Sequence, residues 1–591
     1  MALVVQKFGG TSVADPQKIL AAAQKAIARH QAGHQVVVVV SAMGHQTDVL
    51  VDLAKQISDR PSAREMDMLL STGEQVSVAL FAMAIQSLGH KAVSLTGAQI
   101  GIRTDSTHTK ARIRSISTDH VKKLLDDGAI VIAAGFQGID QNGNITTLGR
   151  GGSDTTAVAL AAVLNADLCE IYTDVDGIYT TDPRMLPKAR RLASISYDEM
   201  LELASLGAGV MHSRSIEFAK KFGVKVLVRS SFKDMPGTVI LAAEESTPRP
   251  ASGVALAKDE ARITLENVPD QPGSSHALFS QLAASGIAVD MIVQNVGQGG
   301  QADISFTVPV DDLPESLELS NRVAKQLGAT GVSHDAELAK VSVVGVGMAN
   351  AEGVAGRMFT ALSRERINVR MITTSEIKIS VLVDRKDGVA AVQAVHHAFG
   401  LEAETAAGDA DVAGSHMVKS SPLDVVRRLE GMEDLAIEDC QLDASQALVT
   451  FTDLPDTPGV AADVFEEVGR AGLFVDMIVQ SQARTEGAVN LTFTTGRRDA
   501  QRAADLMRAA QDQIGFEQIR VDEDVAKVSV VGVGMRSHAG VAQTMFRALA
   551  DKGVKFQAIS TSEIKISVLI DAAYAELAVR ALHSAYGLET V

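Results

Sequence analysis

A lysine on a glycine turn near the start of the chain could support transfer of a phosphoryl group. Lys7 ends a short apolar strand and is followed by Phe8, Gly9 and Gly10. Glycines let backbone N–H groups close on an anion, and a following helix directs its positive N-terminal end to the same point. The lysine cation would then offset charge on the migrating phosphate oxygens. From this segment alone, an ordinary turn with a solvated lysine is an equally good interpretation.

A second glycine-rich turn, LGRGGSDTTA, brings together three polar residues of different chemistry. Arg150 could bind a carboxylate through its forked guanidinium, and Ser153 could donate a hydrogen bond to the same group. Asp154 could orient Lys7 or organise the metal-bound end of a phosphate chain. Residues 155–164 are predicted to form a helix, so this turn also precedes a helix N-terminus.

Further polar residues follow the ends of predicted strands and suit a nucleotide and an amino acid. Ser41 follows the strand 35–40, and Thr47 lies a few residues later. Glu74, in STGEQ, is predicted on a glycine turn, where its carboxylate could hold an ammonium group. In YTDVDGIYTTDPR, the residues that suit a nucleotide pocket are Thr173, Asp174, Tyr179 and Arg184. Each is more often structural than functional when taken alone, and only their joint place at strand ends favours a site.

Length, charge and composition exclude several classes of protein. The 591 residues predict roughly three to five domains. A formal charge of −17 and the lack of tryptophan argue against a nucleic-acid-binding protein. The two cysteines lack a CxxC spacing, so neither a zinc site nor a disulfide framework is predicted. The apolar run 36–40 is too short to cross a membrane and no export signal is recognised, so a cytoplasmic protein is expected.

The pattern of predicted elements changes near residue 245. Before it, apolar strands ending at small or polar residues alternate with helices, which is typical of a mainly parallel sheet covered on both faces. After a linker rich in proline and serine, the sequence repeats itself. The repeated blocks VDMIVQ and SEIKISVL begin at Val289 and Val475 and at Ser375 and Ser562. Each repeat has two similar halves, so we predict two tandem pairs, or four βαββαβ modules.

Other nucleotide-binding motifs are not supported. GVGMAN and GVGMRS lack the third glycine of a dinucleotide fingerprint, because Asn350 and Ser537 occupy its place. We find neither a P-loop nor the HRD and DFG elements of protein kinases. His45 and His212 are interpreted as peripheral.

The motifs KFGGTSV, VVVVVSAMG, LSTGEQ, GFQG, LGRGGSDTTA and YTDVDGIYTTDPR resemble, as a series, those of the aspartate kinases within the amino-acid-kinase family. The repeated PDxPG, VDMIVQ and SEIKISVL blocks resemble ACT regulatory modules. The resemblance implies an α/β fold, in which a three-layer αβα kinase domain with a mainly parallel sheet precedes four ferredoxin-like ACT modules. The expected boundaries are 1–245 for the kinase domain, 246–337, 338–405, 431–524 and 525–591 for the modules, and 406–430 for a linker.

The resemblance also implies roles for the residues named above. Lys7 and Asp154 would be catalytic, with ATP and Mg²⁺ as cofactors and L-aspartate as substrate. The ATP-binding set would be Lys7, Phe8, Gly9, Gly10, Ser41, Thr173, Asp174, Tyr179 and Arg184. The substrate-binding set would be Thr47, Glu74, Arg150, Gly151, Gly152 and Ser153. The acceptor carboxylate is already ionised, so positioning and charge neutralisation would suffice to form 4-phospho-L-aspartate, the first step towards lysine, threonine and methionine.

Feedback inhibition by lysine, threonine or both is implied through the ACT modules. A free amino acid needs an acceptor for its ammonium and donors for its carboxylate, and an aspartate beside an amide supplies both. The effector-binding sets would be Asp270, Gln294 and Asn295 in the first pair and Asp456, Gln480 and Ser481 in the second. Both aspartates could instead cap turns before the following prolines. By analogy, an assembly of two or more chains through the ACT modules is expected.

Two departures from the family pattern affect these expectations. Gly209 stands where many aspartate kinases have a lysine facing the nucleotide. Ser481 replaces the amide of Asn295, so the second pair is expected to have the weaker effector site, or none. Two alternative functions remain open at this point: another amino-acid kinase, similar to acetylglutamate kinases, and an amino-acid sensor with an inactive kinase domain.

Overall fold

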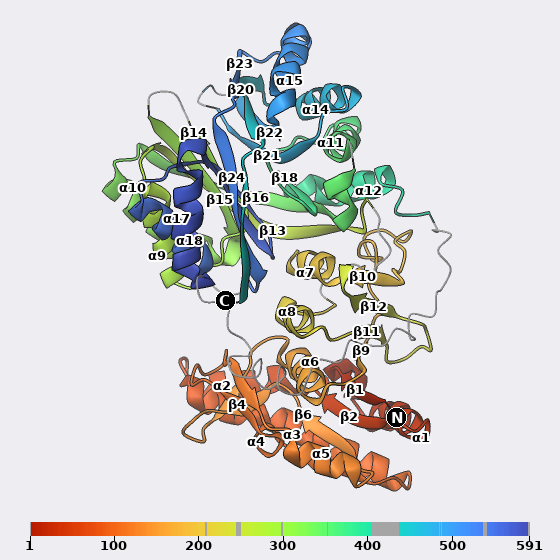
Figure 1. Ribbon diagram of the computed structural model, residues 1–591. Coiled ribbons are helices and arrows are strands. Elements are labelled where there is room, and N and C mark those ends of the chain that lie inside the picture. The colour runs from red at the N-terminus through yellow and green to blue at the C-terminus, as the bar shows by residue number, and fades with distance from the viewer. Residues whose placement is uncertain are drawn as a thin grey trace.

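The computed structural model describes residues 2–206, 210–243, 250–296, 300–351, 353–403, 436–483, 485, 487–535 and 540–588. An N-terminal α/β part, red to yellow in Figure 1, lies below a C-terminal part rich in strands, green to blue. Gly209 and the expected linker 406–430 lie outside the described residues.

The N-terminal part is built on an eight-stranded sheet with the order β10-β12-β11-β9-β1-β2-β6-β3. Its strands are β1 (Leu3–Phe8), β2 (Gln35–Val40), β3 (Ala92–Leu95), β6 (Ile130–Ala134), β9 (Leu168–Thr173), β10 (Ser194–Ser196), β11 (Val226–Ser230) and β12 (Thr238–Leu241). All neighbouring strands run parallel except β11 and β12. The mainly parallel sheet predicted from the sequence is therefore confirmed.

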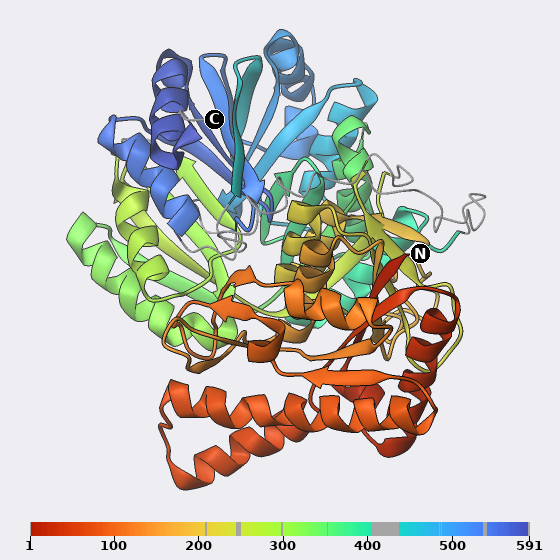
Figure 2. The same ribbon diagram turned by 60° about the horizontal axis from the view of Figure 1, so that its bottom comes forward.

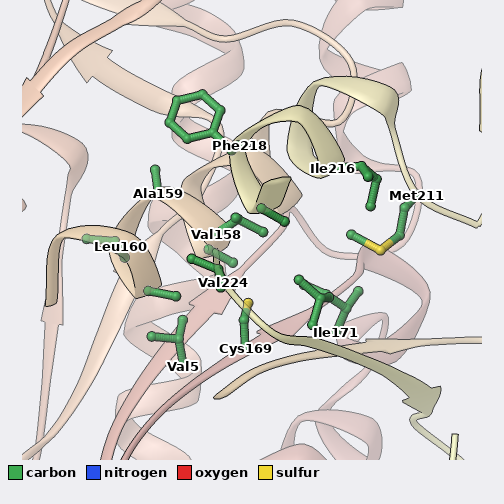
Figure 3. Close-up of a cluster of buried hydrophobic side chains, with 14 of the residues drawn as sticks. Val5, Val158, Ala159, Leu160, Cys169, Ile171, Met211, Ile216, Phe218 and Val224 are labelled. Atoms are coloured by element: carbon green, nitrogen blue, oxygen red, sulfur yellow. The ribbon is translucent and has the colours of Figure 1, made fainter. Parts of the chain in front are cut away.

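Helices cover both faces of this sheet, which gives three layers. Val36, Val38 and Val40 of β2 pack with α1 (Pro16–Gln31) and α3 (Ala63–Ser87) on one face. Val37 and Val39 pack with helices on the opposite face. Figure 3 shows part of that second layer, where Val5, Cys169 and Ile171 of the sheet lie beneath Val158 and Leu160 of α6. The further helices of this part are η1 (Gly10–Val13), α2 (Gln46–Ile57), α4 (Gly97–Ile100), α5 (Asp119–Asp126), α6 (Gly152–Leu164), α7 (Tyr197–Ser205) and α8 (Ser213–Phe222).

Local sequence signals explain where α1 begins and how a small second sheet is placed. Asp15 caps α1 by accepting a hydrogen bond from the Lys18 N–H at 2.8 Å, and Pro16 occupies the first helical position. The second sheet has the order β5-β4-β7-β8. Its strands are β4 (Ile102–Thr104), β5 (Ile113–Ile116), β7 (Gln137–Ile139) and β8 (Ile145–Thr147).

Among the described residues, α3 is the one helix long and apolar enough to cross a membrane by length and composition. Its most apolar window is 56% buried inside the protein, as in a core helix. Phe81 and Ile85 of α3 are fully buried against the sheet.

The C-terminal part contains a ten-stranded sheet, β14-β15-β13-β16-β18-β17-β21-β22-β20-β23, and a four-stranded sheet, β19-β24-β26-β25. We call residues 253–403 the first repeat and residues 436–588 the second repeat. The first repeat comprises β13 (Gly253–Pro269), α9 (Ser274–Ala284), β14 (Ile292–Val296), β15 (Gln301–Pro309), η3 (Val310–Asp312), α10 (Leu313–Leu327), β16 (Gly331–Val344), η4 (Val346–Asn350), α11 (Val354–Arg364), β17 (Met371–Ser375), β18 (Lys378–Asp384), η5 (Arg385–Asp387) and α12 (Gly388–Ala398). The second comprises β19 (Ala436–Asp443), β20 (Gln446–Pro455), α14 (Val460–Arg470), β21 (Val475–Gln482), β22 (Ala488–Gly496), α15 (Arg497–Ala509), α16 (Gln511–Ile514), β23 (Gln518–Asp522), β24 (Val525–Val533), α17 (Gly540–Asp551), β25 (Phe556–Thr561), β26 (Lys565–Asp571), η7 (Ala572–Tyr574) and α18 (Ala575–Tyr586).

The strands divide between modules less simply than the chain order suggests. The first half of β13, 253–257, pairs with the second half of β16, while residues 260–266 of β13 pair with its first half. One long strand thus serves two modules, and the expected boundary at residues 337 and 338 falls inside β16. In the second repeat two separate strands make the corresponding pairings, because β19 pairs with β24 and β20 pairs with β23.

The two repeats pair crosswise within the chain. The second half of the first repeat joins the first half of the second repeat, because β17 pairs with β21 and Phe359 of α11 contacts Phe465 of α14. The outer halves pair likewise, with Phe279 of α9 against Phe546 of α17. Green and blue helices accordingly lie side by side in both views (Figures 1 and 2). We call these contacts the inner junction (α11, β17, α14, β21) and the outer junction (α9, β14, α17, β25).

Candidate active site and regulatory contacts

A cavity of about 940 Å³ lies at the carboxyl ends of β1 and β2, where ligands of parallel α/β sheets bind. Many of the residues predicted for catalysis and substrate binding line it together. They are Lys7, Gly10, Ser41, Thr47, Glu74, Arg150, Gly151, Gly152, Ser153 and Asp154. Segments separated by up to 147 residues of chain, from Lys7 to Asp154, thus meet at one place, as the strand-end argument predicts.

Lys7 and Asp154 form an ion pair in the lining of this cavity. The Lys7 Nζ lies 2.6 Å from the Asp154 Oδ1, and both side chains are nearly buried. Asp154 lies in the first turn of α6, which begins at Gly152, earlier than the predicted residue 155. Position 10 in the cavity lining must be glycine, because a Cβ there would lie 2.8 Å from the Ala42 carbonyl oxygen.

Glu74 is not on a turn, as the sequence analysis expected, but inside the long helix α3. Gly73 is glycine because a Cβ would lie 2.8 Å from the Ala42 Cβ, so the residue marks a close approach of α3 to the end of β2. The Ala42 N–H donates to Glu74 Oε1 at 3.0 Å, and Oε2 is buried with no hydrogen-bond partner among the described residues. Burial raises the pKa of Glu74 to about 7.

Several cavity residues were missed by the sequence analysis. His212, interpreted there as peripheral, lines the cavity and packs so closely on Gly151 that a Cβ on the glycine would lie 2.3 Å from the His212 Cβ. Burial lowers the pKa of His212. The other missed residues include Thr109, Lys110, Arg112, Arg214, Lys221, Val533 and Gly534. Most come from loops and helices that have no glycine-rich motif, and the last two come from the second repeat.

The remaining residues predicted for the nucleotide are absent from the cavity lining and lie at the end of β1, at the end of β9 and in the loop that follows β9. Thr173 ends β9, its carbonyl accepts the Ser231 N–H at 2.8 Å, and its hydroxyl donates to Asp174 at 3.1 Å. The Phe8 side chain is fully buried and stacks on Tyr172, so its role is in the core. The Gly9 N–H donates to the Tyr172 carbonyl. The backbones of Tyr179 and Arg191 form an isolated antiparallel β-bridge. The Arg184 side chain is exposed and forms a forked ion pair with Asp182.

The predicted effector residues gather at the two junctions. At the inner junction, Asp456 accepts a hydrogen bond from Asn368 at 2.8 Å and pairs with Arg370 at 3.2 Å, and Gln480 donates to the Val369 carbonyl. At the outer junction, Asp270 lies 3.6 Å from the Lys555 ammonium.

The remaining effector residues lie in the strands of the sheet. Gln294 donates to the Phe556 carbonyl at 3.4 Å. Ser481 is buried in β21 and lines a small cavity of about 50 Å³ with Gln294. Asn295 lies in β14.

A second cavity of about 260 Å³ lies at the inner junction and was not predicted. Its charged lining residues are Glu376, Asp443, Asp476 and Lys527. Phe465 and Leu473 supply apolar walls. The cavity therefore combines an excess of negative charge with an apolar surface of amino-acid size.

Two buried glutamates of α7 connect the N-terminal part to the repeats. Glu199 accepts hydrogen bonds from the Ser252 hydroxyl at 2.6 Å and the Val346 N–H at 3.0 Å. Glu202 pairs with Lys378 at 2.8 Å and accepts the Glu563 N–H at 2.9 Å. Because α7 packs on α8, which carries cavity residues, this contact lies between the junctions and the cavity.

Comparison with known proteins agrees with this architecture. Residues 2–230 match the model of the amino acid kinase family, and residues 341–399 and 528–586 each match an ACT domain. An aspartate kinase of Pseudomonas putida is 51% identical over 411 residues, covering 69% of this chain and all of that protein. An aspartokinase of Geobacillus stearothermophilus is 52% identical over 410 residues, covering 69% of this chain and 99% of that protein.

Solved structures extend the likeness to the second repeat. The crystal structure of an aspartate kinase from Synechocystis is 41% identical and covers 100% of this chain and 99% of its own, with a TM-score of 0.53. The structure of E. coli aspartokinase III in complex with aspartate and ADP is 27% identical and covers 67% of this chain and 99% of its own, with a TM-score of 0.56. The chain belongs to the aspartate kinase family of enzymes, with an amino-acid-kinase domain followed by ACT domains.

Proposed function

We propose that the chain transfers the γ-phosphoryl group of ATP to the side-chain carboxylate of L-aspartate and releases 4-phospho-L-aspartate, the first intermediate towards lysine, threonine and methionine. The observation that supports this most directly is the Lys7–Asp154 pair in one cavity with Glu74, Arg150 and Ser153. A phosphate donor and a dicarboxylate acceptor need a cation between them and an acceptor for the ammonium group, and these residues supply both. A related enzyme, E. coli aspartokinase III, was solved in complex with aspartate and ADP.

In this proposal each residue acts by position and charge. Lys7 faces the oxygens of the transferring group, and Asp154 holds the Lys7 ammonium in place. Arg150 and Ser153 bind the carboxylates of aspartate, and the ionised Glu74 binds its ammonium group. Mg²⁺ would come with the nucleotide, because magnesium is commonly held by phosphates and one or two carboxylates, and Asp154 is a suitable carboxylate. The ion would neutralise phosphate charge.

We expect Lys7→Ala to lower kcat at least about a hundredfold, with the KM for aspartate changed by only a few-fold, because one charge contact of the transition state is lost. The assay couples ADP release to a spectroscopic signal, with aspartate, glutamate and N-acetylglutamate as acceptors. Lys18→Ala, on the exposed face of α1, is the matched control and should behave like the parent. Preference for N-acetylglutamate, or inactivity with every acceptor, would favour the two alternative functions and contradict the proposal.

The raised pKa of Glu74 gives a second test. At pH 6 most of the Glu74 carboxyl is protonated and cannot pair with the aspartate ammonium, whereas at pH 8 most of it is ionised. The KM for aspartate should therefore fall severalfold as pH rises through about 7. Glu74→Gln should raise the KM and remove this pH dependence. An unchanged pH profile in Glu74→Gln would show that another group titrates.

We also propose that lysine, threonine or both inhibit the enzyme by binding at the junctions between the repeats. E. coli aspartokinase III, a relative, was solved in complex with lysine and aspartate in a T-state. The acidic lining of the 260 Å³ cavity suits the second ammonium of lysine. An assembly of several chains and a cytoplasmic location stay predictions. The crosswise pairing of the modules is made inside one chain, so light scattering is needed to measure the number of subunits.

A further inference from the structure

We propose that Asp67 is a positioning residue that holds the acceptor side of the active-site cavity in shape, an inference that rests on the proposed function. Asp67 lies on α3 and is fully buried. Such a burial of a carboxylate is costly unless hydrogen bonds satisfy it. Asp67 does not line the cavity itself, so its role would be exerted through the groups that donate to it.

Those donors come from two separate segments of chain. From the loop between β4 and β5, His108 Nδ1 donates to Asp67 at 2.6 Å, and the Thr109 N–H donates to both carboxylate oxygens at 3.0 and 3.1 Å. From the end of β8, the Thr147 hydroxyl donates to Asp67 Oδ1 at 2.5 Å. One buried carboxylate therefore ties this loop and the end of β8 to the same point of α3.

Both tied segments form walls of the cavity. Thr109, Lys110 and Arg112 of the loop line it, as do Thr147 and the residues up to the glycine turn at Arg150. Arg214 also joins the two segments, because its guanidinium donates to the Ala111 and Leu148 carbonyls. The shape of this wall is therefore held by two sets of contacts, one accepted by the Asp67 carboxylate and one donated by the Arg214 guanidinium.

The backbone of Thr109 shows why the contact is needed. Thr109 has a φ of +67°, in the left-handed region that β-branched residues rarely adopt. Such a conformation persists where the surroundings hold it, and the Asp67 carboxylate binds the Thr109 N–H directly. Without Asp67 we expect the loop to relax and to move Lys110 and Arg112 out of the cavity wall.

The position of Asp67 on α3 links this wall to the proposed ammonium site. Asp67 and Glu74 are both buried and lie seven residues apart on the helix, which is two turns, or about 10 Å. Glu74 faces the end of β2 through Ala42, whereas Asp67 faces the β4–β5 loop. The helix α3 thereby sets the distance between Glu74, the proposed site for the substrate ammonium, and the cavity wall that contains Lys110 and Arg112.

The test uses Asp67→Ala, Asp67→Asn and a matched control in the full-length protein. We expect Asp67→Ala to raise the KM for aspartate at least about tenfold while the KM for ATP changes less than about threefold. Asp67→Asn, which keeps one carbonyl oxygen as acceptor, should recover most of the loss. Asp303→Ala is the control, because Asp303 also accepts the N–H of a residue with positive φ, Asn267, at 2.7 Å but lies in the first repeat and outside the cavity lining.

Two further measurements keep the proposal open to contradiction. His108→Ala removes one donor only and should shift the KM for aspartate in the same direction by a smaller factor, even if Asp67→Ala folds poorly. Amide hydrogen exchange of residues 105–112 should accelerate in Asp67→Ala, and this readout does not depend on which acceptor the enzyme uses. Parent-like exchange of this loop, or equal changes in the KM for ATP and aspartate, would overturn the inference. A parent enzyme inactive with aspartate would contradict the proposed function instead.

Discussion

The two repeats have the same order of elements, but a lysine at the centre of each has a different environment. In the first repeat the Lys340 ammonium is 1% exposed and lies between Glu260, at 2.7 Å, and Asp290. In the second repeat Lys527 pairs with Asp476 and borders the 260 Å³ cavity. Gln446 occupies the place that corresponds to Glu260 and donates to Asp443.

The lysines of the repeated SEIKISVL block differ in a second way. Lys378 is buried against Glu202 of α7, whereas Lys565 pairs with the half-exposed Glu376 of the other repeat. The kinase domain contacts both repeats, since Glu202 also accepts the Glu563 N–H, but the Glu202 carboxylate forms an ion pair with Lys378 and not with Lys565. The duplication therefore preserved the backbone, and the contacts with the kinase domain and the inner cavity made the two copies chemically unequal.

The largest expected effect is on folding stability. Lys340→Met removes the ammonium that lies between the buried carboxylates of Glu260 and Asp290. Removing one partner of a buried ion pair lowers the free energy of unfolding by about 3–5 kcal/mol. Lys527→Met leaves Asp476 beside a cavity that water can enter, so we expect about half of that loss or less. Urea unfolding followed by circular dichroism measures both, since the chain has no tryptophan. Equal losses would mean that the two centres are equivalent despite their different partners.

A smaller effect is expected on the coupling between effector and catalysis. Lys378→Met removes the partner of the buried Glu202 and should raise the effector concentration for half-inhibition about tenfold, within the usual range of coupling free energies. Lys565→Met, at the corresponding position, removes a cation that pairs with Glu376 and leaves the Glu202–Lys378 pair intact, so it should change this concentration less than about twofold. The uninhibited kcat should stay near that of the parent in both variants. If both variants lose inhibition to the same degree, α7 is not the route of coupling.

Much of this architecture was accessible from the sequence because it depends on local patterns. The strand runs predicted the parallel sheet, and the strand-end rule brought Lys7 and Asp154 to one cavity. Glu74 was misplaced because a glycine that permits close helix packing has the same appearance in the sequence as a glycine in a turn.

Pairing between distant segments was much harder to predict. The repeats predicted the modules, but no spacing says which module contacts which, so the crosswise junctions were missed. The same is true of β13, whose two halves serve different modules. Cavity residues such as Arg112 and Arg214 lie on segments that carry no motif of their own, and only tertiary packing places them.

The smallest effect should distinguish the two junctions as effector sites. An effector ammonium must displace a cation of the chain at either junction, and the Lys555 ammonium is held at Asp270 by both the carboxylate and the backbone carbonyl. Asp456 faces the neutral Asn368 and an Arg370 that it shares with Asp384. We therefore expect Asp456→Ala to raise the half-inhibitory concentration about three- to tenfold and Asp270→Ala less than about twofold.

This order of effector sites is the reverse of the one expected from the replacement of the Asn295 amide by Ser481. We expect the Lys555 ammonium to weaken effector binding at the outer junction more than the missing amide weakens it at the inner junction. Lys555→Asn gives the outer junction the residue that the inner junction has at Asn368, and it should strengthen effector binding there. Inhibition curves with lysine and threonine, alone and together, measure all three variants. If Asp270→Ala is the more resistant enzyme, the Lys555 ammonium moves aside on binding and the outer junction is the stronger effector site.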